Sequence, residues 1–180
     1  MQPTTHTATS VPRQLRYNSR IFHRTSKHTR SANLSAYLAS PLGFTESGRF
    51  YLNHVLLPFF DRFDRLIVLN PWQYAIEPES DPIAIGARNV EMLSLADFAI
   101  AILDGPDVDS GTAAEIGFAC ANGLPIIGLR HDQRHANDHP HTTINLQVEY
   151  FIRYSGGCLV SSLDEMEHIL RIWLDQDLTR

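Results

Sequence analysis

The sequence predicts an α/β domain in which a parallel sheet of five strands is flanked by helices. Short apolar runs alternate along the chain with longer amphipathic stretches, and the most continuous run, residues 98–103, reads FAIAIL. A run without polar residues is typical of a central parallel strand, because such a strand is covered on both faces. The regular alternation of strands and helices favours a doubly wound sheet of the flavodoxin or Rossmann type.

Residues that interrupt regular structure set the expected boundaries of the elements. Pro41 and Pro71 end the first two apolar runs, because proline has no N–H to donate to a sheet. Pro82 suits the first turn of a helix, and Gly123 suits the position after one. The expected strands are residues 34–40, 65–69, 98–103, 125–129 and 158–160. The expected helices are residues 46–60, 82–95, 111–122, 143–152 and 164–174.

The chain is long enough for one domain, which a segment of different composition precedes. Its 180 residues carry a net charge of −5, yet six of the fifteen basic residues precede the first acidic residue, Glu46. Residues 1–33 lack apolar periodicity, so burial there cannot offset the entropy lost on ordering. We therefore expect a flexible basic tail at residues 1–33 and a single domain at residues 34–180. A transit peptide, a nucleic-acid-binding arm and an over-long start are alternatives for the tail.

The composition of the remainder disfavours several classes of protein. From Glu46 on, nine basic residues stand against twenty acidic ones, which disfavours nucleic acid as the main partner because phosphate neutralisation supplies most such affinity. No apolar run approaches the roughly 18–20 residues that span a bilayer, so no membrane segment is expected. Cys120 and Cys158 lack the spacing of a disulfide or zinc motif, which predicts buried thiols in a cytoplasmic protein. No glycine-rich phosphate loop occurs, so no cofactor is expected.

A histidine-rich stretch raises the question of a metal site. Its members are His131, His135, His139 and His141. Neutral imidazoles are common metal ligands, and a spacing of four would align them on a helix. Pro140 breaks such a helix, so solvated loop histidines are expected and no metal.

The polar segment after FAIAIL is the richest in groups that could carry chemistry. It places Asp104, Asp107 and Asp109 in a loop and Glu115 in the helix that follows. Four carboxylates are expected to converge at one strand end, with Glu115 kept ionised by the helix N-terminus. Asp109 is then expected to be partly protonated by its acidic neighbours. A nucleophilic carboxylate beside an acid is the arrangement that cleaves glycosidic bonds.

A purely structural interpretation fits the same residues. Thr112 and Glu115 have the spacing of a capping box, in which Thr112 caps the helix and Glu115 reaches back to the N–H of the cap. The loop aspartates are also common turn formers. The spacing alone leaves both interpretations open.

Five ordered blocks resemble the nucleoside 2-deoxyribosyltransferase family. They are YLASPLGF, VLNPWQ, ADFAIAILDGPDVDSGTAAEIGFA, GLPIIGLRHD, and INLQVEYFI followed by SGG, spanning residues 37–160. The resemblance implies a nucleobase exchange on 2′-deoxyribonucleosides through a covalent deoxyribosyl intermediate on Glu115. It also implies nucleosides and free nucleobases as partners, and homo-oligomers, dimers or multiples of dimers, with shared active sites.

The resemblance implies roles for further residues. Tyr37 is expected to set the nucleophile, Asp109 to contact the nucleobase and Gln73 to line the base pocket. Asn145, beside exposed apolar residues, is expected to enter a neighbouring subunit's site. The other residues expected to bind substrate are Asn89, Asp104, Ser110, Gly111 and Gln147. Phe44 and Trp72 either stack on a base or pack in the core.

One departure from the family pattern leaves the substrate open. Family members often carry an aspartate where this chain has Asn89, eight residues before Asp97, and an amide cannot donate a titrating proton. Asp109, a water or a different substrate could account for the change, and Asp97 is expected to be structural. The alternatives are a nucleoside or nucleotide N-glycosidase, with Arg49 near a helix start gripping a 5′-phosphate, and a non-catalytic nucleoside-binding module.

Overall fold

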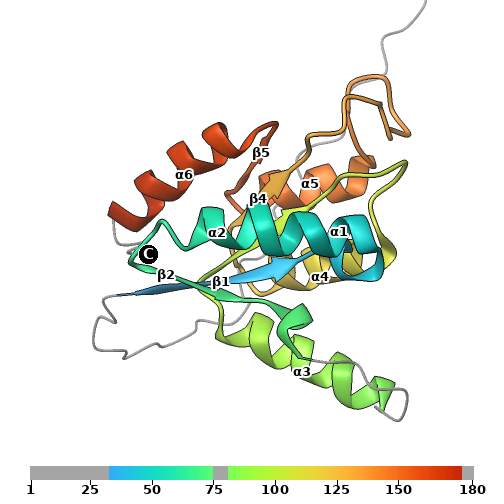
Figure 1. Ribbon diagram of the computed structural model, residues 1–180. Coiled ribbons are helices and arrows are strands. Elements are labelled where there is room, and N and C mark those ends of the chain that lie inside the picture. The colour runs from blue at the N-terminus through green and yellow to red at the C-terminus, as the bar shows by residue number, and fades with distance from the viewer. Residues whose placement is uncertain (1–32, 75–80, 176–180) are drawn as a thin grey trace, which may run out of the picture.

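The computed structural model describes residues 33–74 and 81–175 (Figure 1). The expected tail at residues 1–33 lies, apart from Asn33, outside the described residues. The part of the chain that is described forms one layered α/β unit, with helices on both sides of a sheet.

Five parallel strands form the sheet in the order β2-β1-β3-β4-β5, which confirms the predicted fold class. The strands are β1 Leu34–Ala39, β2 Leu66–Leu69, β3 Phe98–Ile102, β4 Ile126–Leu129 and β5 Cys158–Val160. This order is that of the flavodoxin-like sheet. Because the winding direction changes between β1 and β3, the loops after these two strands diverge and leave a crevice at their carboxyl ends.

The helices follow the expected sequence of elements. They are α1 Glu46–Tyr51, η2 Leu52–Leu56, α2 Leu57–Phe60, α3 Pro82–Leu95, α4 Ser110–Ala121, α5 Leu146–Tyr154 and α6 Leu163–Asp175. Two short 3₁₀ turns, η1 Leu42–Phe44 and η3 Pro71–Gln73, follow β1 and β2. None of the helices within the described ranges is long and apolar enough to cross a membrane.

The alternation of side chains along β1 assigns residues to the two faces of the sheet. Ala36 and Leu38 pack with the α1–η2–α2 segment and α6 in one cluster, whereas Tyr37 and Ala39 pack with α3, α4 and α5 in the other. Figure 1 shows α1 and α2 above β1 and β2, and α3 below them. Tyr37, which is fully buried, is therefore directed toward the face that α4 covers.

The helix predicted at residues 46–60 contains a π turn in its middle. The N–H of Leu57 bonds to the carbonyl of Leu52, five residues earlier. Pro58 has no N–H, so the regular bond from this position is missing and the helix widens just before it.

The helix predicted at residues 143–152 begins later, at Leu146. The side-chain oxygen of Asn145 accepts from the N–H groups of Gln147 and Val148, which fixes the start of α5. The apolar neighbours of Asn145 were expected to be exposed. Leu146 is exposed, but Ile144 is fully buried in the core. The prediction of an exposed apolar patch around Asn145 is therefore correct for Leu146 and wrong for Ile144.

Both cysteines are free thiols, and each is partly rather than fully buried. Burial raises the pKa of the Cys120 and Cys158 thiols, because an ionised sulfur is poorly stabilised away from water. The expectation of buried thiols is thus correct only in part.

Replacing Gly157 by alanine should destabilise the domain by at least the roughly 1–3 kcal/mol typical of overpacking. A Cβ at this position would lie 1.8 Å from the carbonyl oxygen of Ile126, a backbone atom that cannot swing away. Gly86→Ala is the matched control, because nothing lies within 4 Å of the added atom. That change should stabilise α3 by about 0.5–1 kcal/mol. Urea denaturation of both variants checks the contrast, and equal effects would contradict it.

Candidate active site

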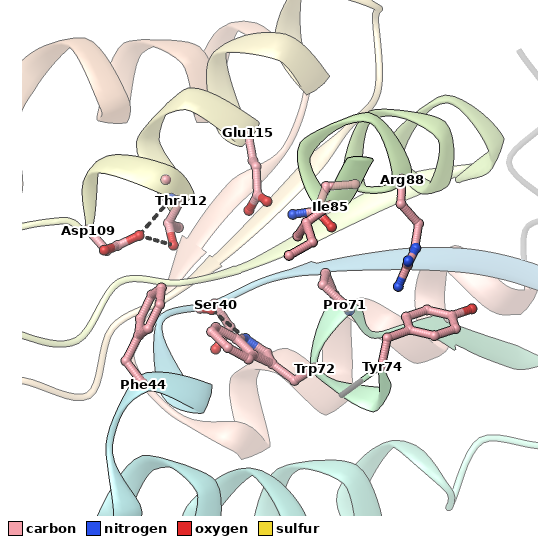
Figure 2. A pocket seen from close by; sticks show the side chains of 12 residues that line it. Ser40, Phe44, Pro71, Trp72, Tyr74, Ile85, Arg88, Asp109, Thr112 and Glu115 are labelled. Atoms are coloured by element: carbon pink, nitrogen blue, oxygen red, sulfur yellow. Dashed lines mark hydrogen bonds between the residues drawn. The ribbon is translucent and has the colours of Figure 1, made fainter. Parts of the chain in front are cut away.

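A cavity of about 300 Å³ lies at the carboxyl ends of β1 and β2, beside the start of α4. Its volume is that of a pocket for a small organic ligand. Figure 2 shows its lining side chains converging from four segments of the chain. They are Ser40, Phe44, Pro71, Trp72, Tyr74, Ile85, Arg88, Asn89, Asp109, Gly111, Thr112 and Glu115. The cavity therefore occupies the crevice that the strand order predicts.

Glu115 lies in the second turn of α4 and is hydrogen-bonded to a side chain of β1. The hydroxyl of Tyr37 donates to Oε1 of Glu115 at 2.5 Å. Tyr37 is fully buried, so this hydroxyl has little freedom to turn elsewhere. Burial, together with the negative charge of Glu115, raises the pKa of Tyr37 far above its ordinary value. Tyr37 therefore stays protonated and acts as a fixed donor to the carboxylate.

The pKa of Glu115 is raised to about 7. Burial is the main cause, and the negative charge of Asp109 adds to it, whereas the hydrogen bond from Tyr37 lowers the pKa. The expectation that the helix N-terminus keeps Glu115 ionised is wrong, because the pKa of Glu115 is raised rather than lowered. The effect of a helix terminus falls off within its first turn, and Glu115 lies beyond that turn.

Asp109 is the N-cap of α4. One of its carboxylate oxygens accepts from the N–H of Thr112 at 2.9 Å and from the Thr112 hydroxyl at 3.2 Å (Figure 2). The capping-box alternative is therefore wrong, because Thr112 does not cap the helix and Glu115 is bonded to Tyr37 instead. Asp109 faces the same cavity as Glu115, so two carboxyls share it.

The other two acidic residues of the loop turn away from this cavity. Asp104 accepts from the backbone N–H groups of His131 and Asp132, at 2.6 and 2.7 Å, beside the end of β4. Asp107 accepts from the N–H of Val108, its own neighbour. The expected convergence of four carboxylates is thus wrong, because Asp104 binds the backbone after β4 and Asp107 binds the backbone of its own loop.

A buried arginine fixes the loop between β3 and α4. Arg130 donates to the carbonyl oxygens of Leu103 at 2.5 Å, Gly105 at 3.2 Å and Arg134 at 2.7 Å. Only 8% of Arg130 is exposed, so these carbonyls replace the water that its guanidinium loses. The position of the loop that carries Asp109 is therefore tied to the end of β4.

Aromatic side chains form the wall of the cavity opposite α4. The indole Nε1 of Trp72 donates to the carbonyl oxygen of Ser40 at 2.8 Å. The Phe44 ring meets the Trp72 ring edge-on, with 4.7 Å between the ring centres. The indole lies directly over Gly43, where a Cβ would be 2.0 Å from the ring. Phe44 is 67% exposed, so much of its surface remains open to a ligand. Both side chains line the cavity, and Trp72 also packs against the core cluster, so stacking on a base stays a prediction.

The far end of the cavity consists of residues that the sequence analysis did not single out, apart from Asn89. Ile85, Arg88 and Asn89 share one face of α3 through their spacing of three and four residues. The guanidinium of Arg88 lies over the Tyr74 ring, 4.7 Å from its centre. Amphipathic spacing next to Asn89 is the only signal that could have found Arg88, and an exposed helical arginine is too common to be chosen on that basis.

Several predicted substrate-binding residues lie outside the cavity of their own chain. Gln73 and Ser110 are exposed and do not line the cavity, and Asp104 binds the backbone after β4. Gly111, in contrast, does line the cavity. The residues of the α5 start, Asn145 and Gln147, are also outside the lining, and Asn145 is engaged as the helix cap and with Asp138. Service of Asn145 in a neighbouring subunit stays a prediction, as do the homo-oligomer and the cytoplasmic location.

The remaining polar clusters have structural partners. Within the described ranges, no three histidine, cysteine or acidic side chains are placed to hold a metal ion. His131 Nδ1 lies 3.3 Å from Asp104, and His139 and His141 lie near one another in the loop. Asp97 accepts from the N–H and the hydroxyl of Ser35, so it joins β1 to β3 as expected.

The fold and the paired carboxyls define a class of ligand-binding α/β domain with the groups needed to act on a glycosidic bond. Residues 36–159 match the family model described as nucleoside 2-deoxyribosyltransferase. The match covers more than half of the chain, so this chain belongs to the nucleoside 2-deoxyribosyltransferase family. No curated protein sequence matches the chain significantly.

Solved structures share the fold at low sequence identity. A conserved protein from Enterococcus faecalis V583 is 25% identical with a TM-score of 0.66, covering 81% of this chain and 99% of that one. A 2-deoxyribosyltransferase from Bacillus psychrosaccharolyticus is 21% identical with a TM-score of 0.57, covering 74% and 90%. A CMP N-glycosidase from Clostridium botulinum is 18% identical with a TM-score of 0.54, covering 77% and 98%. The fold thus occurs in both a transferase and a hydrolase.

Replacing Glu115 by glutamine should change the free energy of unfolding in a pH-dependent way. The folded state binds the Glu115 proton more tightly than the unfolded state, because the pKa rises from 4.5 to about 7. Stability is therefore lost as the pH rises through this window, by roughly 3 kcal/mol for this group. Glutamine keeps an oxygen for Tyr37 and does not titrate, so the variant should gain on the wild type as the pH increases.

Urea denaturation of both proteins between pH 4.5 and pH 8 measures this difference. Glu91→Gln, at an exposed position of α3, is the control and should show no comparable trend. A constant difference between wild type and Glu115→Gln across the range would contradict the raised pKa.

Proposed function

We propose that this chain is a nucleoside 2-deoxyribosyltransferase in which Glu115 forms a covalent deoxyribosyl-enzyme. The observation that carries the proposal is the position of Glu115, which lines the cavity while its Oε1 is held by Tyr37. Membership of the family supports the same assignment. A lone helical glutamate without this donor and this cavity would have no such role.

The contacts of Glu115 suit it to attack an anomeric carbon. Because Oε1 accepts from Tyr37, Oε2 is the oxygen left for attack on C1′. Burial makes the carboxylate less well solvated and more basic than an exposed one, yet a pKa of about 7 leaves a substantial ionised fraction at neutral pH. Attack by Oε2 releases the first base, and a second base then displaces Glu115. Two displacements retain the configuration at C1′.

The rest of the cavity supplies surfaces for the two halves of a nucleoside. Asp109 lies on the α4 side with Glu115, where its free acceptor positions suit sugar hydroxyls rather than the nucleobase contact that the resemblance implies. Phe44 and Trp72 form the opposite wall, where flat aromatic surface suits a nucleobase. The wall and the carboxyls together favour a nucleoside over a sugar alone.

An N-glycosidase is the main alternative, because water in place of the second base gives hydrolysis from the same intermediate. The 5′-phosphate grip expected at Arg49 stays a prediction, because Arg49 is outside the cavity lining and one of its N–H groups donates to the carbonyl of Gly43 at 2.9 Å. A non-catalytic binding module is the other alternative. Incubation of the full chain with a deoxynucleoside, with and without a second free base, separates exchange, hydrolysis and no reaction by chromatography of the products.

Glu115→Ala should lower the exchange rate by several orders of magnitude, because positioning alone cannot replace a nucleophile. The wild type incubated with a slow 2-fluoro deoxynucleoside should gain the mass of one fluorinated sugar, and the variant should not. Intact-mass spectrometry and product analysis measure both effects. Glu91→Ala, exposed on α3, is the control for a change of one helical glutamate. Normal turnover by Glu115→Ala would end the proposal.

Tyr37→Phe should move the acid limb of the pH–rate profile to higher pH. The hydrogen bond from Tyr37 lowers the pKa of Glu115, so its removal raises this pKa above about 7 and less carboxylate is ionised at neutral pH. The profile of kcat/KM against pH for one deoxynucleoside measures the shift. A limb at unchanged pH would show that Tyr37 does not act through the ionisation of Glu115.

A further inference from the structure

The two ends of the cavity have opposite electrostatic character. Glu115 and Asp109 lie at the α4 end, and Arg88 comes from α3 at the other end. Among the described lining residues, Arg88 is the one that carries a positive charge. A ligand that spans the cavity therefore meets acceptors at one end and a donor-only cation at the other.

Arg88 is held in place without using up its donors. Its guanidinium carbon lies 4.7 Å from the centre of the Tyr74 ring, a cation–π contact that positions the group but occupies no N–H. In the described part of the chain, no carboxylate forms an ion pair with it. Figure 2 shows Arg88 pointing from α3 toward the Tyr74 ring, on the side of the cavity away from Asp109. Its five N–H groups are thus available to a ligand.

The order of groups along the cavity decides which part of a nucleoside Arg88 meets. If Glu115 attacks C1′, the sugar lies beside α4, and the base extends away from it toward α3. The base edge farthest from the glycosidic bond then faces Arg88 and Asn89. That edge carries a carbonyl oxygen in uracil, thymine and hypoxanthine, and an amino group in cytosine and adenine. A guanidinium can donate to the carbonyl oxygen but has no acceptor for an amino group.

We propose that Arg88 is a specificity-determining residue that selects nucleobases with a carbonyl oxygen on this far edge and stabilises their departure as anions. The inference rests on the proposed function. As the Glu115 oxygen bonds to C1′, the electron pair of the C1′–N bond leaves with the base, and the charge of the carboxylate moves to the base. The leaving anion carries part of this charge on its carbonyl oxygen, where Arg88 donates. No proton donor is required at the Asn89 position.

Binding of free bases tests the selection without any chemistry. The receptor is the full chain with Glu115→Gln, and the probes are uracil against cytosine and hypoxanthine against adenine, measured by calorimetry. Each oxo base should bind at least about tenfold more tightly than its amino counterpart, as expected for a charge-assisted hydrogen bond. Adding Arg88→Met should weaken the oxo bases about tenfold and leave the amino bases within about twofold. Arg88→Lys should recover part of the loss.

Three results would overturn the proposal. They are equal weakening of both classes of base by Arg88→Met, no binding of an oxo base to the receptor, and binding of inorganic phosphate that Arg88→Met removes while base binding is unchanged. The last result would assign Arg88 to a phosphate. Arg171→Met on α6, outside the cavity lining, is the control and should leave every binding constant unchanged.

Kinetics on the chain with an intact Glu115 separate this proposal from the proposed function. Arg88→Met should lower kcat for deoxyuridine and deoxyinosine by about tenfold or more, with a smaller effect on deoxycytidine and deoxyadenosine. No exchange by the wild type with any nucleoside would contradict the transferase assignment while the binding contrast could still hold. Exchange that is equally sensitive to Arg88→Met for both classes would contradict the role of Arg88 alone.

Discussion

The hydrogen bond between Tyr37 and Glu115 is the interaction on which the arrangement of the site depends. It joins β1 to α4, the helix that follows β3, and β3 is the neighbour of β1 in the sheet. The two residues are 78 positions apart in sequence. Tyr37 is fully buried, so one donor replaces much of the hydration that the carboxylate loses. Because the replacement is incomplete, the pKa of Glu115 stays near 7, and the carboxylate is both ionisable and reactive at neutral pH.

Other polar groups in the region hold the backbone and leave the cavity to Glu115 and Asp109. Arg130 binds the carbonyls after β3, and Asp104 binds the N–H groups after β4, so the two loops are fixed to one another. With the loop fixed, Asp109 is placed to cap α4 and at the same time to line the cavity. The rigidity of these backbone contacts is what keeps the carboxyls of α4 in one orientation, which a displacement reaction requires.

Periodicity predicted the sheet, its parallel direction and most boundaries, because a buried parallel strand needs an apolar run and a helix needs a capped amphipathic one. The α3 and β5 boundaries agree with the structure, as Pro82 and the short apolar run at Cys158 fix them locally. The π turn before Pro58 and the late start of α5 at Asn145 were not predicted. Both depend on which of several possible hydrogen bonds the backbone forms, and residue spacing does not decide that.

The sequence by itself determined that Glu115 follows the central strand, and the ordered motifs around it indicated the family. Only the tertiary structure decided what Glu115 touches, because Thr112, Asp109 and Tyr37 could each have been its partner. It also decided that Asp104 serves the loop, and it brought Arg88 and Tyr74 to the far end of the cavity. A chain fixes the order of its carboxylates and cations, whereas packing across a sheet fixes the distances between them, and the electrostatics of a site depend on those distances.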